Sequence, residues 1–186
     1  MPQPIMRFKE HLKEFDSESD RALVILAAAM LEELLEQLLR ARLVPHAGNN
    51  DPLFDGVNAP FSSFSASIDG CFRTGLISSQ LARDLHLLRK IRNDFAHGVT
   101  SANFSIPAVL SRVSELSRSH GLFERSPNWS RTFGTMTPRK NFVLTVVAMI
   151  TALEAAISIT NSISENPREW FYTESFDDID KKEQNT

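Results

Sequence analysis

A short segment near the middle of the chain carries the side chains best suited to chemistry. Its sequence is Arg92-Asn93-Asp94-Phe95-Ala96-His97, and Gly98 follows it. An imidazole titrates near neutral pH and can accept or donate a proton, whereas a guanidinium offers a fixed fork of donors to phosphate or carboxylate oxygens. If the segment is helical, Asn93 lies one turn before His97 and could orient its ring. Arg92, Asn93 and His97 are therefore the candidate catalytic residues.

The reaction that these side chains would fit is cleavage of RNA without a metal. That reaction needs a base for the 2′-hydroxyl, an acid for the leaving oxygen and positive charge on the phosphate. One histidine cannot easily supply both proton steps, so two copies would have to meet across a symmetric dimer. In the alternative, the cluster has a structural or interaction role: His97 caps the last carbonyls beside Gly98, and Arg92 pairs with Asp94, Glu115 or an acid of the first long helix. The residues leave both alternatives open.

A helix over about 79–96 must position this cluster. Apolar side chains at helical spacing form one side of it: Leu81, Leu85, Leu88, Ile91 and Phe95. A solvated helix face usually mixes acids with bases, but the opposite side of this helix is cationic, amide and imidazole. This side, with Arg92 at its boundary, is the predicted binding surface: His86, Arg89, Lys90, Arg92, Asn93 and His97.

Four other segments have a helical period, at about 19–43, 61–72, 107–119 and 138–163. Serine or threonine precedes several of them as an N-cap, and proline opens the last two. No segment alternates as a strand would. The predicted fold class is therefore all-α, a single-domain helical bundle of about five main helices. The stretch Leu23–Leu31 is apolar all round, which predicts burial on every side, as the central helix of a bundle or a helix shared with a second subunit.

The length and the charge pattern suggest how the chain is divided. At 186 residues it suits one domain, with an N-terminal segment at 1–16, the bundle at 17–163 and an acidic tail at 164–186 that its aromatic residues partly dock. The net charge is −3, and residues 163–186 hold seven acids against three bases. The rest of the chain is therefore near +1, which lacks the basic stripe typical of tight duplex DNA binding.

Composition limits the kinds of site and the cellular location that we expect for this protein. The histidines have no metal-ligand spacing, so neither a metal nor a cofactor is expected. The single cysteine, Cys71, cannot form an internal disulfide and is expected to be a reduced core residue of a cytoplasmic protein. The uninterrupted apolar stretch Leu23–Leu31 has nine residues, against the roughly 20 needed to span a bilayer. The first ten residues hold no apolar stretch typical of a secretion signal. A soluble, cytoplasmic protein without a membrane segment is expected.

Five segments between roughly residues 15 and 120 form a pattern whose order and spacing are more specific than any single motif. They are Phe15-Asp-Ser-Glu-Ser-Asp-Arg-Ala22, Asp51-Pro-Leu-Phe-Asp-Gly56, Pro60-Phe-Ser-Ser-Phe-Ser-Ala66, Thr74-Gly-Leu-Ile-Ser78 and Leu88-Arg-Lys-Ile-Arg-Asn-Asp-Phe-Ala-His97. Together these segments resemble the mannitol operon repressor (MltR-like) family. The resemblance implies an all-helical bacterial cytoplasmic protein, some relatives of which are named transcriptional repressors. Because that family does not look like a helix-turn-helix protein, the resemblance implies repression through other proteins more than direct reading of an operator.

The segment from Arg92 to His97 is also similar to the Arg-x4-His signature of HEPN domains. Asparagine directly after the arginine is frequent in that superfamily. The resemblance implies a helical bundle, often dimeric, and in many members a metal-independent ribonuclease.

Two functions therefore stand at this point. The first is an MltR-like regulator, a homodimer that represses or modulates through an unidentified protein partner. The second is a HEPN-type endoribonuclease, a toxin or defence effector that uses Arg92 and His97 on RNA. Whether the chain is an enzyme stays open, and direct binding of duplex DNA ranks last.

Overall fold

The computed structural model describes residues 4–97, 103–120 and 134–166. Within these ranges it holds six helices and no strand, which confirms the all-α prediction. The helices are α1 (Pro4–Asp16), α2 (Asp20–Arg42), α3 (Phe64–Arg73), α4 (Ser79–His97), α5 (Pro107–His120) and α8 (Pro138–Ile159).

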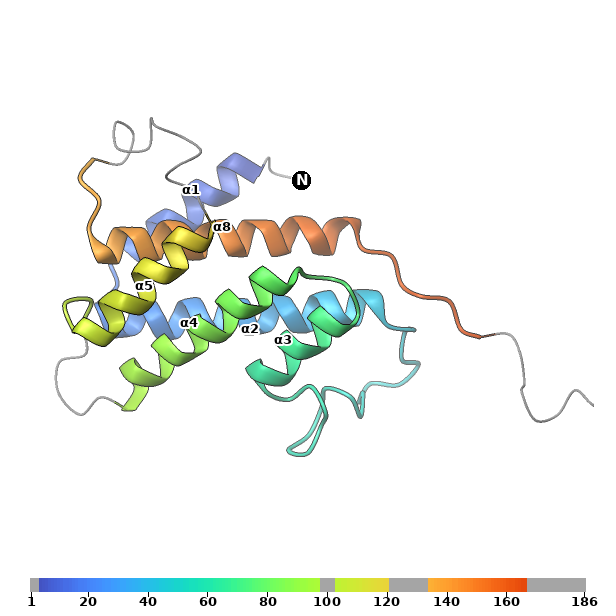
Figure 1. Cartoon of the computed structure of the whole chain (residues 1–186). Coiled ribbons are helices and arrows are strands. Elements are labelled where there is room, and N and C mark those ends of the chain that lie inside the picture. Colours follow the sequence, from blue (N-terminus) through green and yellow to red (C-terminus); the bar gives the residue numbers. More distant parts are fainter. Residues whose placement is uncertain (1–3, 98–102, 121–133, 167–186) are drawn as a thin grey trace, which may run out of the picture.

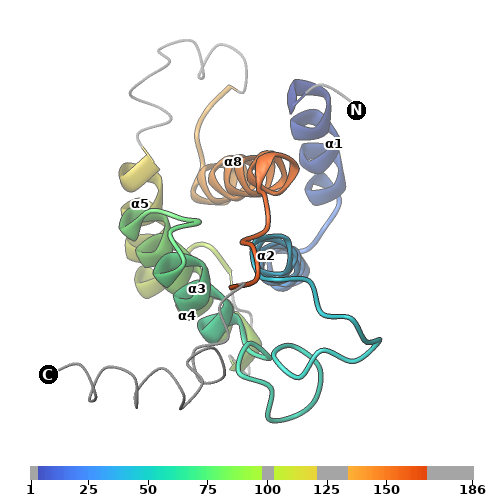
Figure 2. The same ribbon diagram turned by 90° about the vertical axis from the view of Figure 1, so that its right-hand side faces the viewer.

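Four of these helices enclose the core. α2 packs on α8, α8 on α5, α5 on α4, and α4 again on α2. The remaining two flank this ring, since α1 lies against α8 while α3 lies against both α2 and α4. Figure 1 shows α8 running along α2, and the end-on view in Figure 2 shows α8 between α1 and α5 with α2 beneath it.

α2 and α8 run in the same direction and are fastened to each other at both ends. At their starts, Arg139 Nη1 lies 2.5 Å from Asp20 Oδ1, and Arg139 Nη2 donates to the carbonyls of Phe15 and Glu18. At their ends, the N–H of Ile163 donates to the Arg42 carbonyl at 2.8 Å. Parallel neighbours need a long connection between them, and here α3, α4 and α5 make it.

Three aromatic side chains contact one another in the core and connect α4 to α8. Phe95 of α4 lies 5.4 Å from Phe104, centroid to centroid, and Phe104 lies 5.2 Å from Phe142 of α8. All three side chains are buried, so they contribute both apolar burial and the tilted ring contacts that aromatic pairs prefer. These contacts fix the position of α4 along the axis of α8.

The sequence assigned no helix to residues 1–16, yet α1 covers Pro4–Asp16. Phe15 is fully buried, and Phe8 and Leu12 pack beside the core. His11 Nε2 lies 3.2 Å from Glu154 Oε1 on α8, and Arg7 Nη1 lies 3.2 Å from its other oxygen. These contacts form only when α8 is in place, which explains why local periodicity did not reveal α1.

Two further expectations need correction. The last helix ends at Ile159, before the expected 163, because Thr160 is extended (φ −75°, ψ 131°) and the chain turns toward the end of α2. The stretch Leu23–Leu31 is not buried on every side of this chain, since Ile25 is 42% exposed and Ala29 is also exposed. α2 is nevertheless the central helix, in contact with α3, α4 and α8.

α8 is the one helix of the described ranges that is long and apolar enough to cross a membrane by length and composition. Here it serves as a core helix. Its buried side chains include Phe142, Val146, Ile150 and Leu153, and α1, α2 and α5 surround it. Sequence runs of this kind are as typical of a core helix as of a membrane span.

Gly70 marks a place where α3 approaches its surroundings too closely for a side chain. A Cβ at this position would lie 2.6 Å from Phe61 Cε1 and 3.2 Å from Leu39 Cδ1. Alanine normally favours a helix over glycine by about 1 kcal/mol. We predict that Gly70→Ala instead lowers the free energy of unfolding by about 1–2 kcal/mol, because overpacking outweighs propensity. Urea denaturation measures it, with Ser65→Ala on the same helix as a control that should lose nothing; a stabilised Gly70→Ala protein would contradict this packing.

Candidate functional site

The site is built on α4, whose start is set by local sequence. Gly75 adopts a left-handed conformation (φ +73°) that ends α3. Ser78 then accepts a hydrogen bond from the N–H of Leu81 at 3.2 Å and caps the new helix. α4 runs to His97; Gly98, which follows it, lies outside the described residues.

The two sides of α4 divide as the periodicity predicted. Leu85, Leu88, Ile91 and Phe95 are fully buried, and Leu81 packs against the core from a half-buried position. The six predicted binding residues stay accessible, with Lys90 and His97 exposed and the other four half-buried. We call these six side chains the α4 polar face: His86, Arg89, Lys90, Arg92, Asn93 and His97.

Arg92, at the edge of this face, is turned toward α2 and the start of α3. There Glu32 of α2 has a pKa raised above its usual value, mainly because burial disfavours its charged form. The positive charge of Arg92 and the backbone N–H of Phe64 each lower that pKa in part, and Glu36 raises it. Glu32 is therefore the acid of the first long helix that faces Arg92, while Asp94 and Glu115 have other partners.

Those other partners connect α4 to its neighbours. Asp94 forms an ion pair with Arg112 of α5. Arg83 bridges Glu115 of α5 at 3.0 Å and the buried Asp84 at 3.1 Å. These pairs fasten the α5 side of α4 and leave the polar face on the side toward α3.

His86 is the member of the face with a partner on α3. Its Nε2 lies 3.1 Å from Oδ1 of Asp69, whose side chain is largely exposed. When the imidazole is protonated the contact becomes an ion pair. His86 thus links the middle of α4 to the exposed side of α3.

Two guanidinium groups of the face have unmet donors. Within the described ranges, the Nε atoms of Arg89 and Arg92 are buried and make no hydrogen bond. A buried donor left without an acceptor costs free energy, commonly about 1–3 kcal/mol. Both Nε atoms are shielded from solvent, so an acceptor from outside the chain could not reach them while the side chains keep this position. What the face offers to an outside group is its positive charge, from the exposed Lys90 and the half-buried Arg89 and Arg92, which favours a carboxylate or a phosphate.

The geometry required of a nuclease is less well met. Arg92 and His97 are five positions apart on α4, which places them about 140° apart around a helix. Arg92 faces Glu32, while His97 is exposed at the end of the helix. Within the described residues, no hydrogen bond joins Asn93 to His97. Neither of the two cavities described below is lined by Arg92, Asn93 or His97.

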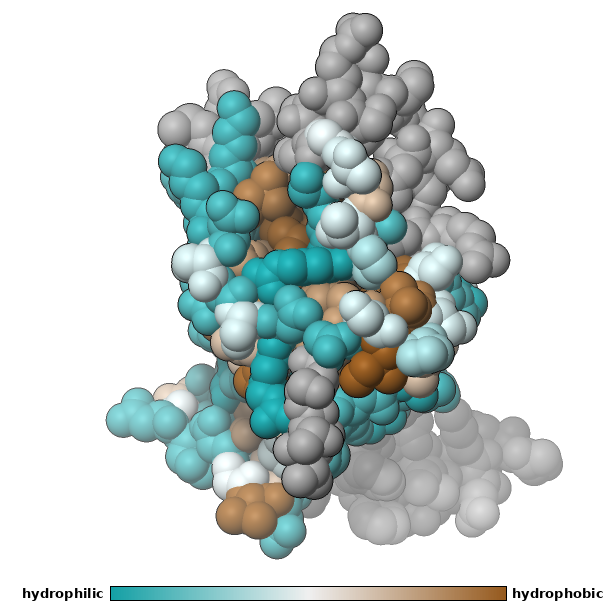
Figure 3. Space-filling model, turned by 90° about the vertical axis from the view of Figure 1, so that its left-hand side faces the viewer, coloured by the Kyte–Doolittle hydropathy of each residue, from teal (hydrophilic) through white to brown (hydrophobic). Residues whose placement is uncertain are grey.

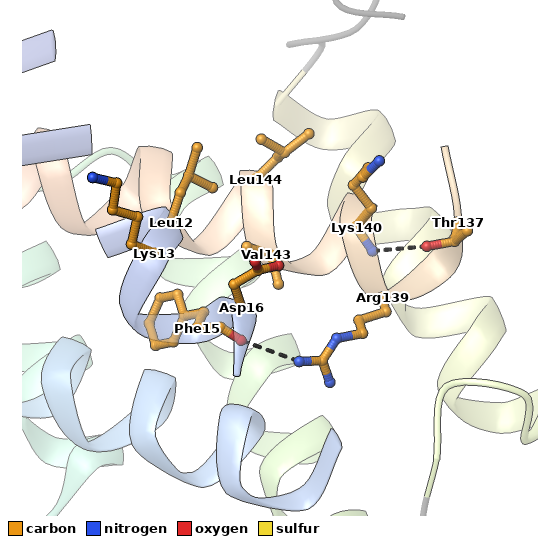
Figure 4. A pocket seen from close by; sticks show the side chains of 9 residues that line it. All are labelled: Leu12, Lys13, Phe15, Asp16, Thr137, Arg139, Lys140, Val143 and Leu144. Atoms are coloured by element: carbon orange, nitrogen blue, oxygen red, sulfur yellow. Dashed lines mark hydrogen bonds between the residues drawn. The ribbon is translucent and has the colours of Figure 1, made fainter. Parts of the chain in front are cut away.

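The larger cavity lies between α1 and α8, at the opposite side of the fold. It measures about 410 Å³ and is lined by Leu12, Lys13, Phe15, Asp16, Thr137, Arg139, Lys140, Val143 and Leu144. Figure 3 shows apolar surface set among hydrophilic side chains on this end of the molecule, and Figure 4 shows the Arg139 guanidinium turned to the Phe15 carbonyl. Arg139 therefore holds α1 against α8. The polar group that lines this cavity has a structural role.

The smaller cavity, about 150 Å³, borders the loop that contains Asp51 to Gly56. Arg40 of α2 lies 2.8 Å from Glu36 and 2.9 Å from Asp55, and its guanidinium sits 4.1 Å above the Phe54 ring. The pKa of Asp55 is lowered, mainly by a hydrogen bond from the Asp51 backbone. Asp51 and Asp55 therefore fasten the loop to α2 through Arg40.

The remaining candidates for chemistry give no site. The Cys71 thiol is fully buried and donates to the Leu35 carbonyl, and burial raises its pKa to about 12, so it is not a nucleophile at neutral pH. No group of three histidine, cysteine or acidic side chains in the described ranges lies close enough to hold a metal.

Sequence reasoning expected an acid of the first long helix near Arg92 without identifying Glu32, and it missed Asp69. Glu32 lies in the amphipathic half of α2, where an acid is ordinary, and Asp69 is 17 positions before its partner His86. No local pattern connects either acid to α4, since both contacts depend on how the helices pack.

Comparison with known proteins supports the fold alone. No family model and no curated protein sequence matches the chain. Among solved structures, the chain is similar to one from the X-ray structure of the MtlR–HPr complex from Escherichia coli, with a TM-score of 0.57 and 19% identity over 83% of this chain and 99% of that one. This chain has an MtlR-like fold. The resemblance to mannitol operon repressors is thus confirmed for the fold, whereas the resemblance to HEPN domains gains no support.

The environment of Glu32 gives a prediction about stability and pH. A carboxyl whose pKa is raised by folding contributes stability below its unfolded pKa, and that contribution is lost as pH rises through the folded pKa. Glutamine cannot ionise and still accepts a hydrogen bond. We predict that the stability of Glu32→Gln relative to the wild type improves from about pH 4 to about pH 7, as measured by urea denaturation. Glu33→Gln, at the exposed neighbouring position, is the control; a difference that shrinks or stays constant would refute the account of Glu32.

Proposed function

We propose that this protein is a regulator that acts by binding another protein through the α4 polar face, without catalysis. The observation that carries the proposal is the cluster of positive charge on this face, where Arg89 and Arg92 are half-buried. They lie beside Lys90 and His97, which are exposed. A surface of this kind suits a partner that presents carboxylates or free backbone carbonyls, since charged hydrogen bonds to arginine are stronger than neutral ones.

The similarity of the fold to a solved structure also supports binding of another protein. The similar solved structure is a complex between MtlR and another protein, HPr. We therefore propose HPr, or a protein with a similar surface, as the partner class for this chain. Regulation would then pass through protein contacts in the cytoplasm, as a transcriptional corepressor or modulator in bacteria. The net charge of −3 favours this arrangement over direct reading of duplex DNA.

The ribonuclease alternative is weaker because Arg92 lies near Glu32, on a different side of α4 from His97. It makes a distinct forecast that is simple to test: purified wild-type protein would cleave RNA, and His97→Ala would not. The regulatory proposal expects no cleavage by either protein.

We predict that HPr binds the wild-type protein and that Arg89→Glu combined with Lys90→Glu weakens binding at least tenfold, or about 1.4 kcal/mol. Charge reversal on a charged contact surface removes attraction and adds repulsion. Isothermal titration calorimetry with purified HPr measures this effect.

The matched control is Lys9→Glu combined with Lys13→Glu. It makes the same change of net charge at exposed positions on α1, outside the α4 polar face, and should retain wild-type affinity. Equal losses in the two double variants would refute a specific role for this face.

We also propose that the protein is a homodimer that uses the exposed side of α2. Ile25 is 42% exposed, Ala29 one turn later is exposed, and Ala22 and Leu26 beside them are half-buried. An apolar strip on an otherwise buried helix is a common mark of a subunit interface. It lies on the side of α2 turned away from the helices that pack on it.

Ile25→Lys tests the dimer directly. We expect sedimentation velocity to show a dimer for the wild type and a monomer for the variant, since a buried unpaired ammonium would be costly in an apolar interface. Arg21→Lys, one turn earlier and charge-conserving, should leave the dimer intact. A monomeric wild type, or a dimer that tolerates Ile25→Lys, would exclude this interface.

A further inference from the structure

The segment at 169–180 has a composition opposite to that of the α4 polar face. It holds five acids and four aromatic residues and no lysine or arginine: Glu169, Trp170, Phe171, Tyr172, Glu174, Phe176, Asp177, Asp178 and Asp180. The prediction that such a tail docks through its aromatic residues concerns residues outside the described ranges. The described residues nevertheless show where the chain leaves the bundle before this segment and which surface is complementary to it in charge.

The departure point is fixed by two hydrogen bonds to the end of α2. The Ile163 N–H donates to the Arg42 carbonyl at 2.8 Å, and Arg42 Nη1 donates to the Asn161 carbonyl at 3.2 Å. The chain therefore leaves the bundle beside Arg42. α3 and α4 both pack against this same helix α2.

The spacing of residues along α2 gives the distance from this departure point to the α4 polar face. Glu32, which faces Arg92, is ten positions before Arg42 on α2, or about 15 Å along the axis. Packed helices lie about 8–10 Å apart, so the face begins about 20 Å from the departure point. The eleven residues from Ile163 to Glu174 span up to about 36 Å when extended, which is enough to go around α3.

The surface that the segment would meet complements it in charge and in shape. Arg89 and Arg92 are half-buried and Lys90 is exposed, so this surface presents three positive charges. On α3, Phe72 is 41% exposed; it lies one turn beyond Asp69, the partner of His86, on the side toward the start of α4. Carboxylates of the segment would pair with the arginines and Lys90, while its aromatic rings would stack on arginine or pack on Phe72.

We propose that residues 169–180 fold back onto the α4 polar face of the same chain and compete there with the protein partner. This inference rests on the proposed function, since it assigns a regulator to that function's binding surface. A tethered segment is present at a high effective concentration, so even a weak contact would lower the affinity for the partner. The partner would have to displace the segment in order to bind.

The test uses full-length protein and a fluorescein-labelled synthetic peptide of residues 167–183. In one variant the segment is neutralised by Glu174→Gln, Asp177→Asn, Asp178→Asn and Asp180→Asn. By fluorescence anisotropy, the neutralised variant should bind the peptide at least tenfold more tightly than the wild type, whose own segment competes. It should also bind HPr severalfold more tightly.

Two added double variants locate the contact. Arg89→Glu with Lys90→Glu, in the neutralised background, should weaken peptide binding at least tenfold, whereas Lys9→Glu with Lys13→Glu should not. Absent peptide binding, equal affinity for wild type and neutralised variant, or indifference to Arg89 and Lys90 would overturn the inference. So would a dimer, seen by sedimentation, that the neutralised variant loses, because the segment would then dock on a second copy. If HPr binds the face and the peptide does not, only this inference fails; if the peptide binds and HPr does not, the proposed partner fails.

Discussion

The parallel pairing of α2 with α8 is the constraint on which the rest of this fold depends. Two helices of similar length lie side by side and are held at their starts by Arg139 and at their ends by the Ile163–Arg42 hydrogen bond. Because they run in the same direction, the chain between them must travel the length of the bundle and return. α3, α4 and α5 make that journey, and their positions follow from the pair they connect.

This constraint places the chemistry of the molecule on the outside of α4. The helix presents its leucines, Ile91 and Phe95 to the core and is fastened to α5 by the Asp94–Arg112 pair. Its polar side is thereby fixed toward α3 and solvent, with Glu32 beneath one edge and Asp69 beside the middle. The result is a cationic surface on the outside of α4, and its charge is the basis of the proposed binding of an acidic protein surface.

Much of this fold could be predicted from the sequence, because the spacing and caps of a helix depend on residues that lie close together in the chain. The apolar spacing of α4, the caps at Ser19 and Thr137, and the left-handed Gly75 all report contacts within a few residues. The division of α4 into a buried and a polar side follows from that spacing alone. The resemblance to mannitol operon repressors likewise identified the fold that the comparison supports.

What could not be predicted depends on contacts between distant segments. α1 becomes a helix against α8 through Arg7 and His11, which find Glu154 more than 140 positions later. Glu32 and Asp69 approach α4 only after α2 and α3 have packed. The exposure of Ile25 is also a tertiary property, since an apolar helix segment gives no sign of which side its neighbours leave open.

The central claim is that the α4 polar face is where this protein meets its partner, and amide hydrogen exchange with and without HPr tests it most directly. We expect slower exchange within α4 around residues 86–97 and on the adjoining exposed side of α3, and unchanged exchange in α1. Protection confined to α1 and the start of α8, or no protection anywhere at saturating HPr, would contradict the claim.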